Sequence, residues 1–227
     1  MKDLLIFDMD GVLVEVSESY RESVVQCVLH FTGQRVSRDR IQEYKNQGGW
    51  NNDWDLSQKI ASDLGVDVPH DVIVTTFNEF FFGTDGGANG NGLILREQWF
   101  PQPGLIERLG RRYQLGIFTG RLQYEADISL RRFAPSLVFD PMICADHVTQ
   151  PKPSPQGLQT IATRLPGRRI VYVGDTVDDA RSAAGAGVPF IGIAAAGDSR
   201  RDELMALFTA ANAMAIIENI NEIESAL

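Results

Sequence analysis

The sequence of 227 residues is poor in cysteine, in histidine and in long hydrophobic runs. Its two cysteines, Cys27 and Cys144, are too few for a disulfide framework, and we expect both thiols to be buried and reduced. The three histidines show no metal-ligand spacing, and we assign them no catalytic role. Nothing in the sequence resembles a signal peptide, because the first apolar run stops at Asp8. No apolar run approaches the ~20 residues of a membrane span. We therefore expect a soluble, cytoplasmic protein.

Positive charge is also scarce. The formal net charge is −9 and the sequence pI is about 4.8, while the hydrophobic content of 44% is that of an ordinary globular protein. An acidic surface repels nucleic acid and anionic membranes, so we expect neither as a partner. An acidic protein that binds phosphate must supply local positive charge or a cation at the site. The sequence leaves open whether the protein is a monomer or a dimer.

Short apolar runs predict the strands of a sheet. Most are continuous rather than alternating, which is typical of strands buried on both faces of a parallel sheet. Helical segments separate them, as at residues 105–112 and 155–164. This alternation predicts an α/β fold, with a doubly wound, Rossmann-like parallel sheet. The runs are Leu4–Phe7, Leu115–Phe118, Met142–Cys144, Ile170–Val173, Phe190–Ile193 and Ala215–Ile217.

A long interval separates the first predicted strand from the second. It spans about a hundred residues, far more than one crossover needs. We predict an inserted helical cap domain at residues 15–96, and an α/β core formed by residues 1–14 and 97–227. Ser17 is the candidate N-cap of its first helix. Apolar periodicity favours helices at residues 24–31, 56–64 and 71–82.

Two polar segments of this insertion attract notice. Residues 83–92 are rich in glycine, but no Lys-Ser/Thr follows, so we interpret them as a loop rather than a phosphate cradle. Residues 45–54 carry two tryptophans and many hydrogen-bonding side chains. This segment either faces the substrate or connects helices with its tryptophans packed inside. In the first case, Lys45, Trp50 and Asn51 are candidates for substrate specificity.

Polar residues follow the first two predicted strands of the core. Asp8 and Asp10 end the first strand, where two carboxylates can surround one reacting centre, although Asp and Gly also favour simple turns. Thr119 and Gly120 end the second, where a hydroxyl and an amide can hold a phosphate oxygen. The alternative for this pair is a helix cap.

Two further polar groups come later in the chain. Lys152 lies between prolines that restrict its backbone, or it is a solvated lysine in a loop. Asp175, Asp178 and Asp179 follow the strand at residues 170–173 and open a helix. Carboxylates in such number favour Mg²⁺, although acidic residues also stabilise helix N-termini.

All four groups fall at the carboxyl ends of predicted parallel strands, which is the edge where open α/β sheets bind ligands. Together they resemble the four motifs of the haloacid dehalogenase superfamily, in the same order. The predicted insertion is similar to the cap of the phosphoglycolate phosphatase and β-phosphoglucomutase branch. The matching segments are Asp8-Met9-Asp10-Gly11-Val12-Leu13, Thr119-Gly120-Arg121, Lys152-Pro153 and Gly174-Asp175-Thr176-Val177-Asp178-Asp179.

The resemblance implies a role for each acidic residue. Asp8 would be the nucleophile and a magnesium ligand. Asp10 would be the general acid and base, and its backbone carbonyl would also bind magnesium. Asp175 would be the second carboxylate ligand. Asp179 would orient a metal-bound water or Lys152, and Asp178 would have at most a supporting role.

The resemblance also implies the phosphate site and the reaction. Thr119, the Gly120 amide and Lys152 would bind the transferring phosphoryl group of a small phosphorylated metabolite. A halide leaving group needs no proton, and dehalogenases of this superfamily lack the second aspartate. The presence of Asp10 therefore favours a phosphoryl substrate over a haloacid. A phosphomutase and a non-catalytic binding regulator remain alternatives. The sequence departs from common relatives at residues 14–17, where many have an aspartate and a serine.

Overall fold

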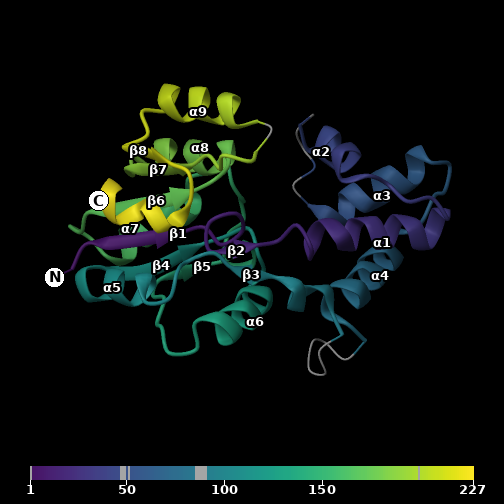
Figure 1. The fold of residues 1–227 in the computed structure, drawn as a ribbon, viewed down its shortest axis with the longest axis horizontal. Coiled ribbons are helices and arrows are strands. Elements are labelled where there is room, and N and C mark those ends of the chain that lie inside the picture. Colours follow the sequence, from purple (N-terminus) through teal and green to yellow (C-terminus); the bar gives the residue numbers. More distant parts are fainter. Residues whose placement is uncertain (1, 47–49, 51, 85–90, 199) are drawn as a thin grey trace. The chain divides into compact units, whose positions relative to one another are not determined.

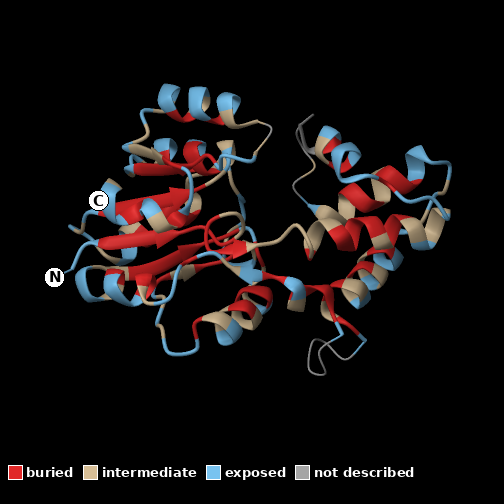
Figure 2. Cartoon of the chain, viewed as in Figure 1, coloured by how far each residue is buried: buried red, intermediate tan, exposed pale blue. Residues whose placement is uncertain are grey.

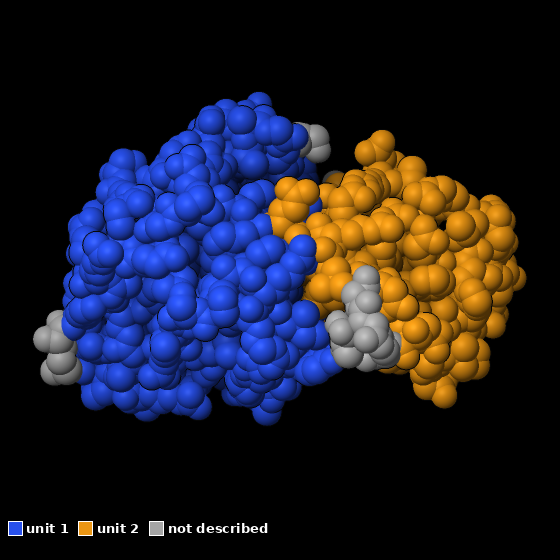
Figure 3. All heavy atoms as spheres, turned by 60° about the horizontal axis from the view of Figure 1, so that its bottom comes forward, with its two compact units in different colours: residues 1–15, 99–227 blue, residues 16–98 orange. Residues whose placement is uncertain are grey.

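The computed structural model describes residues 2–46, 50, 52–84, 91–198 and 200–227. The chain divides into two compact units, which Figure 3 colours separately. Residues 1–15 and 99–227 form the core unit, and residues 16–98 form the helical unit. Each is described by itself below.

The core unit is built on a six-stranded sheet with the strand order β5-β4-β1-β6-β7-β8 (Figure 1). Every pairing in it is parallel, which confirms the predicted α/β fold class. The strand ends lie within one residue of those expected from the apolar runs. The strands are β1 (Leu4–Phe7), β4 (Gln114–Phe118), β5 (Met142–Ile143), β6 (Ile170–Gly174), β7 (Phe190–Ile193) and β8 (Ala215–Ile217).

Helices connect these strands and cover the sheet. Among them, α5 packs against β4, and α8 packs against both β6 and β7. The sheet is buried while the outer helix faces are exposed, as Figure 2 shows. The helices are α5 (Leu105–Arg112), α6 (Gln123–Phe133), η2 (Ala145–His147), α7 (Gln156–Arg164), α8 (Val177–Ala186), α9 (Arg201–Ala210), η3 (Ile220–Glu222) and α10 (Ile223–Ala226).

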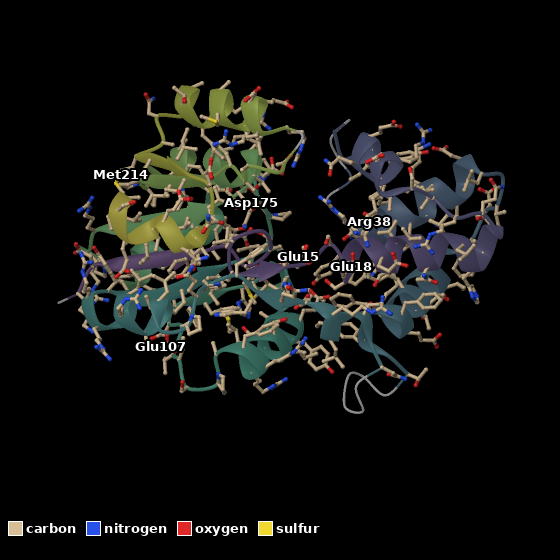
Figure 4. All side chains as sticks on the ribbon, in the orientation of Figure 1. Glu15, Glu18, Arg38, Glu107, Asp175 and Met214 are labelled. Carbon is tan, nitrogen blue, oxygen red and sulfur yellow. The ribbon has the colours of Figure 1, made fainter. Side chains whose placement is uncertain are left out.

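The helical unit contains α1 (Tyr20–Thr32), α2 (Arg38–Asn46), α3 (Asp53–Asp63), α4 (His70–Phe82) and η1 (Leu93–Arg96). Helix α1 packs against α3 and α4, and their apolar faces form the core of this unit. The assignment of Ser17 as a helix N-cap was wrong, because α1 begins at Tyr20 and Ser19 precedes it. Some charged pairs of this unit lie at its surface, such as Arg38 and Glu18 at 2.5 Å (Figure 4), whereas Glu22, which pairs with Arg35, is buried.

Two short strands lie where the chain passes between the units. Strand β2 (Val14–Glu15) and strand β3 (Gln98–Trp99) form a separate two-stranded sheet. The Phe100 amide donates to the Leu13 carbonyl at 3.0 Å next to this pair. The outgoing and returning segments of the chain are therefore held together by backbone hydrogen bonds.

Both cysteines are buried and free, which confirms the expectation drawn from their small number. Burial raises the pKa of the Cys27 thiol to about 12, and it does the same for Cys144. Among the described residues, no helix combines the length and the apolar character that crossing a membrane requires.

Candidate active site

The turn after β1 places Asp8 and Gly11 at the carboxyl edge of the sheet. The Asp8 amide donates to the Val173 carbonyl at 2.8 Å, so the chain still follows β6 at this point. Gly11 then adopts a φ of +73°, in the left-handed region. A Cβ added at Gly11 would lie 1.9 Å from Asp175 Oδ2. Glycine is required here by its backbone conformation and by the close approach of Asp175.

Lys152 is the cation that enters this edge. Its ammonium group lies 2.9 Å from Asp8 Oδ1 and donates to Asp179 Oδ1 at 2.7 Å. The lysine side chain is only 12% exposed. Its ammonium also lies 5.0 Å from the centroid of the Phe118 ring. The lysine ammonium is therefore fixed by two carboxylates and by the Phe118 ring, and little of it is exposed to solvent.

Asp179 is the most heavily bonded carboxylate of the site. It lies in the first turn of α8, and Thr176 is the N-cap residue of that helix. Asp179 Oδ2 accepts from the Thr176 hydroxyl at 2.6 Å and from the Thr176 amide at 3.0 Å. Asp179 Oδ1 accepts from the Tyr172 hydroxyl at 2.6 Å, besides Lys152. The sequence analysis gave no role to Tyr172 or Thr176.

Three carboxylates of the site lie close enough together to bind a metal ion. One carboxylate oxygen each from Asp8, Asp175 and Asp179 lies within 4.8 Å of the other two. Since Asp179 accepts hydrogen bonds at both oxygens, it is the least available of the three as a ligand. Asp175 Oδ1 is buried and has no hydrogen-bond partner among the described residues. A buried carboxylate oxygen without a partner is costly, and a cation would stabilise it. The residues therefore fit a hard divalent cation held by Asp8 and Asp175.

The electrostatics of the site indicate an excess of negative charge. Burial raises the pKa of Asp8 to about 7 against the opposing effect of Lys152, and it raises the pKa of Asp175 well above its usual range. Burial alone would lower the pKa of Lys152, but the Asp179 and Asp8 carboxylates keep it above its ordinary value. One lysine thus faces three carboxylates. A bound cation would favour the ionised state of Asp8 and Asp175.

The segment after β4 supplies a buried side chain and an exposed amide. Thr119 is buried, and its Oγ1 accepts from the Arg121 amide at 3.2 Å. Gly120 is exposed, and among the described residues no atom lies within 4 Å of a Cβ added there. Arg121 Nε donates to Asp10 Oδ1 at 2.6 Å. Arg121 belongs to the Thr119-Gly120-Arg121 segment, but its position after a strand did not predict this contact with Asp10.

The candidate specificity residues belong to the helical unit. Lys45 lies in α2, Trp50 is half-buried, and Asn51 lies outside the described residues. Residues 45–54 are not one loop, because α2 continues to Asn46 and α3 begins at Asp53. Residues 85–90 of the glycine-rich segment also lie outside the described residues. A role for any of these residues remains a prediction.

Cys144, Asp146 and His147 also bring potential ligand atoms within 4.8 Å of one another. One atom of each residue has a local partner, and the Cys144 thiol lies 3.8 Å from Gln123 Oε1. His147 Nδ1 accepts from the Cys144 amide at 3.2 Å, and Asp146 Oδ1 accepts from the Gln123 amide at 3.0 Å at the start of α6. This group is a structural joint between β5 and α6.

The family model of haloacid dehalogenase-like hydrolases matches residues 2–187, which include all four polar groups described above. The chain belongs to this family and is a hydrolase. Its fold and the placement of its charged residues at the carboxyl edge of the sheet agree with this assignment.

Individual relatives extend the comparison. The chain is 32% identical over 197 residues to the imidazoleglycerol-phosphate dehydratase of Phytophthora nicotianae; the match covers 83% of this chain but only 42% of that protein. It is 24% identical to a phosphoglycolate phosphatase of Rhodobacter capsulatus, with 84% of each covered. A structure from Haemophilus somnus 129pt, described as a predicted phosphoglycolate phosphatase, has a TM-score of 0.74 at 17% identity and covers 99% of this chain and 97% of its own. At that identity, the likeness shows a shared fold.

Proposed function

We propose that this chain is a Mg²⁺-dependent phosphatase that hydrolyses a small phosphorylated metabolite through an aspartyl-phosphate on Asp8. The observation that carries the proposal is the buried Lys152, 2.9 Å from Asp8 Oδ1, beside the Asp175 oxygen that has no partner among the described residues. A carboxylate nucleophile, a fixed cation and a ligand for a second cation are what an attack on a phosphate dianion requires. The phosphatase names of relatives such as that of Rhodobacter capsulatus support this reading.

In the first half of the reaction, an Asp8 oxygen attacks phosphorus and the bond to the leaving oxygen breaks. Both reactants carry negative charge, so the ammonium of Lys152 and the exposed Gly120 amide would stabilise the phosphoryl oxygens. Thr119 would contribute its hydroxyl. Asp179 and Tyr172 hold Lys152 in place for this task, because Tyr172 bonds the same Asp179 oxygen as the lysine.

Asp10 would act as the general acid and the general base. It donates a proton to the departing alkoxide and then takes one from the water that hydrolyses the aspartyl-phosphate. Inorganic phosphate leaves, and Asp8 and Asp10 return to their starting states. The Asp10 side chain is 37% exposed, so it is accessible to a leaving group and to water in a way that Asp179, which is fully buried, is not.

Magnesium would be held by the carboxylates of Asp8 and Asp175 and by the Asp10 backbone carbonyl. When bound, it supplies charge neutralisation for the phosphate and the nucleophile. Asp179 is left out of this set, since its two oxygens already accept hydrogen bonds from Tyr172, Lys152 and Thr176. The helical unit, residues 16–98, would act as the cap that reads the rest of the substrate, and Lys45, Trp50 and Asn51 would contribute to it.

The test is phosphate release from a panel of phosphorylated metabolites, measured with Mg²⁺ and with EDTA. The panel includes phosphoglycolate and imidazole-bearing phosphate esters, because the relatives' names refer to such compounds, and sugar phosphates, because a phosphomutase is the alternative. We expect release from one or a few of them, abolished by EDTA and restored by added Mg²⁺. Absence of release from every compound, by a folded protein that binds Mg²⁺, would overturn the proposal.

The same panel separates the two alternatives. A phosphomutase would convert a sugar phosphate into its isomer with little release of inorganic phosphate, which ³¹P NMR of the products detects. A binding regulator would yield neither product. The full set of acid, base and cationic residues favours catalysis over binding alone.

A further inference from the structure

Arg121 is among the largest fully buried side chains described, and its guanidinium is tied at both ends. Its side chain is only 1% exposed. Nε donates to Asp10 Oδ1 at 2.6 Å, and Nη1 donates to Ser129 Oγ of α6 at 2.7 Å. The backbone is fixed as well, because the Arg121 carbonyl accepts from the Ala145 amide at 2.9 Å.

Within the site, the arginine binds Asp10 Oδ1. Burying a guanidinium is expensive, so it is retained where its bonds are short and directional. Being almost without exposed surface, Arg121 has no face to offer a substrate phosphate. Among the four polar groups, its guanidinium contacts Asp10 through the Oδ1 atom. The Asp10 side chain is 37% exposed, and the bond to Arg121 restrains its rotation.

We infer that Arg121 is a positioning residue: it holds Asp10 by Oδ1, and so leaves Oδ2 as the oxygen that exchanges protons with the leaving group and with water. This inference rests on the proposed function, in which Asp10 is the acid and base. A proton donor is effective only within hydrogen-bond reach of the leaving oxygen, so an Asp10 released from Arg121 would lose much of its effect.

The inference distinguishes two kinds of phosphate ester. An alkyl ester leaves as a basic alkoxide and needs a proton, whereas a nitrophenyl ester leaves as a stable phenolate and does not. Loss of a residue that acts through Asp10 therefore penalises alkyl esters selectively. Loss of a residue that binds the phosphoryl group would penalise both esters alike, because they carry the same phosphate.

The experiment compares Arg121→Met with the wild-type protein on β-glycerol phosphate and on p-nitrophenyl phosphate, with Mg²⁺ present. We expect kcat/KM for the alkyl ester to fall by about 10²-fold, the size typical of a misplaced catalytic group. We expect at most a few-fold fall, about 3-fold, for the aryl ester. The ratio of the two constants, rather than either alone, reports the role, since partial unfolding lowers both equally.

Ser129→Ala is the matched control. It removes the bond from the guanidinium to α6 and leaves the bond to Asp10, so the ratio of the two constants stays near that of the wild type. If Arg121→Met does not fold, Arg121→Lys replaces it. A lysine keeps the positive charge but lacks the planar fork that bonds Asp10 through Nε and Ser129 through Nη1, so the alkyl ester is again the one penalised. Equal losses on both esters in the folded variant would overturn the inference. A wild-type protein inactive on both esters and on the metabolite panel would instead overturn the proposed function.

Discussion

The two edges of the core sheet differ in where they keep their charges. At the carboxyl edge, Asp8 and Asp179 are buried, and both contact Lys152, whose side chain is 12% exposed. At the amino edge, charged residues such as Asp3 and Asp140 are exposed, although a hollow of about 600 Å³ lies there. In Figure 4, Asp175 lies near the carboxyl edge and Met214 near the amino edge.

The difference shows that a hollow is a weaker sign of function than buried charge. Removing a charged group from water costs several kcal/mol even after the protein relaxes, about 3–5 kcal/mol when one partner of a buried pair is missing. Exposed charges at the amino edge carry no such cost. The desolvation cost of the buried charges at the carboxyl edge is explained if that edge binds a charged substrate and a cation.

The largest expected contrast is between the two aspartates that flank β1, Asp8 at its carboxyl end and Asp3 at its amino end. Asp8→Asn should lower phosphate release by at least about 10⁴-fold, because it removes the proposed nucleophile. Asp3→Asn, at the exposed amino end of the same strand, should leave the rate unchanged. Both rates are measured on the best substrate of the panel, with circular dichroism as the check on folding. Near-normal turnover by Asp8→Asn would refute the assignment of the nucleophile.

Stability should show the same contrast at a smaller scale. Asp179→Ala leaves Lys152 and the Tyr172 hydroxyl without their shared acceptor, and should reduce the free energy of unfolding by about 3–5 kcal/mol. Asp140→Ala, at the amino edge, should change it little. Urea unfolding of both variants measures the difference. Similar values for the two would mean that the buried network contributes no more than a surface carboxylate.

The smallest effect concerns an exposed ion pair outside the site. Glu224 of α10 lies 2.9 Å from Arg108 of α5, and its hydrogen bond to that arginine lowers the pKa of Glu224. A lowered carboxyl pKa stabilises the fold above the unfolded-state pKa, and this contribution is lost as the pH falls through the folded-state value. Glu224→Gln should therefore lower the melting temperature slightly at neutral pH and not at all at pH 3. High salt should also remove the difference, because the pair is exposed. A larger effect at pH 3 than at pH 7 would contradict this sign.

The fold of the core could be predicted because its strands are buried on both faces. Continuous apolar runs marked each of them to within one residue. Elements with little burial escaped notice. Helix α2, Arg38–Asn46, has buried apolar side chains only at Ile41 and Tyr44, too few for a visible period. Strands β2 and β3 have two residues each, and so leave no pattern.

The site could be predicted in its parts but not in its bonds. Parallel strands end at one edge, so residues separated by more than a hundred positions were expected together there. Which of them bond was not visible, since a bond depends on side-chain direction. Tyr172 lies in an apolar strand, and a buried tyrosine hydroxyl requires a partner, which was a usable signal. Arg121 carried a similar signal, because a charged residue directly after a buried strand must be solvated or paired.

The pairing of β2 with β3 makes the helical unit a modular insertion. Since its entry and exit are hydrogen-bonded neighbours, the core chain is nearly continuous across the gap. The entropy cost of closing the intervening segment grows only slowly with its length, so the core tolerates a long insertion there. A short turn joining Glu15 to Trp99 could replace residues 16–98 without disturbing the register of the main sheet. If the helical unit reads the substrate as proposed, exchange of the whole insertion should change the preferred substrate while the residues at the carboxyl edge of the core stay the same.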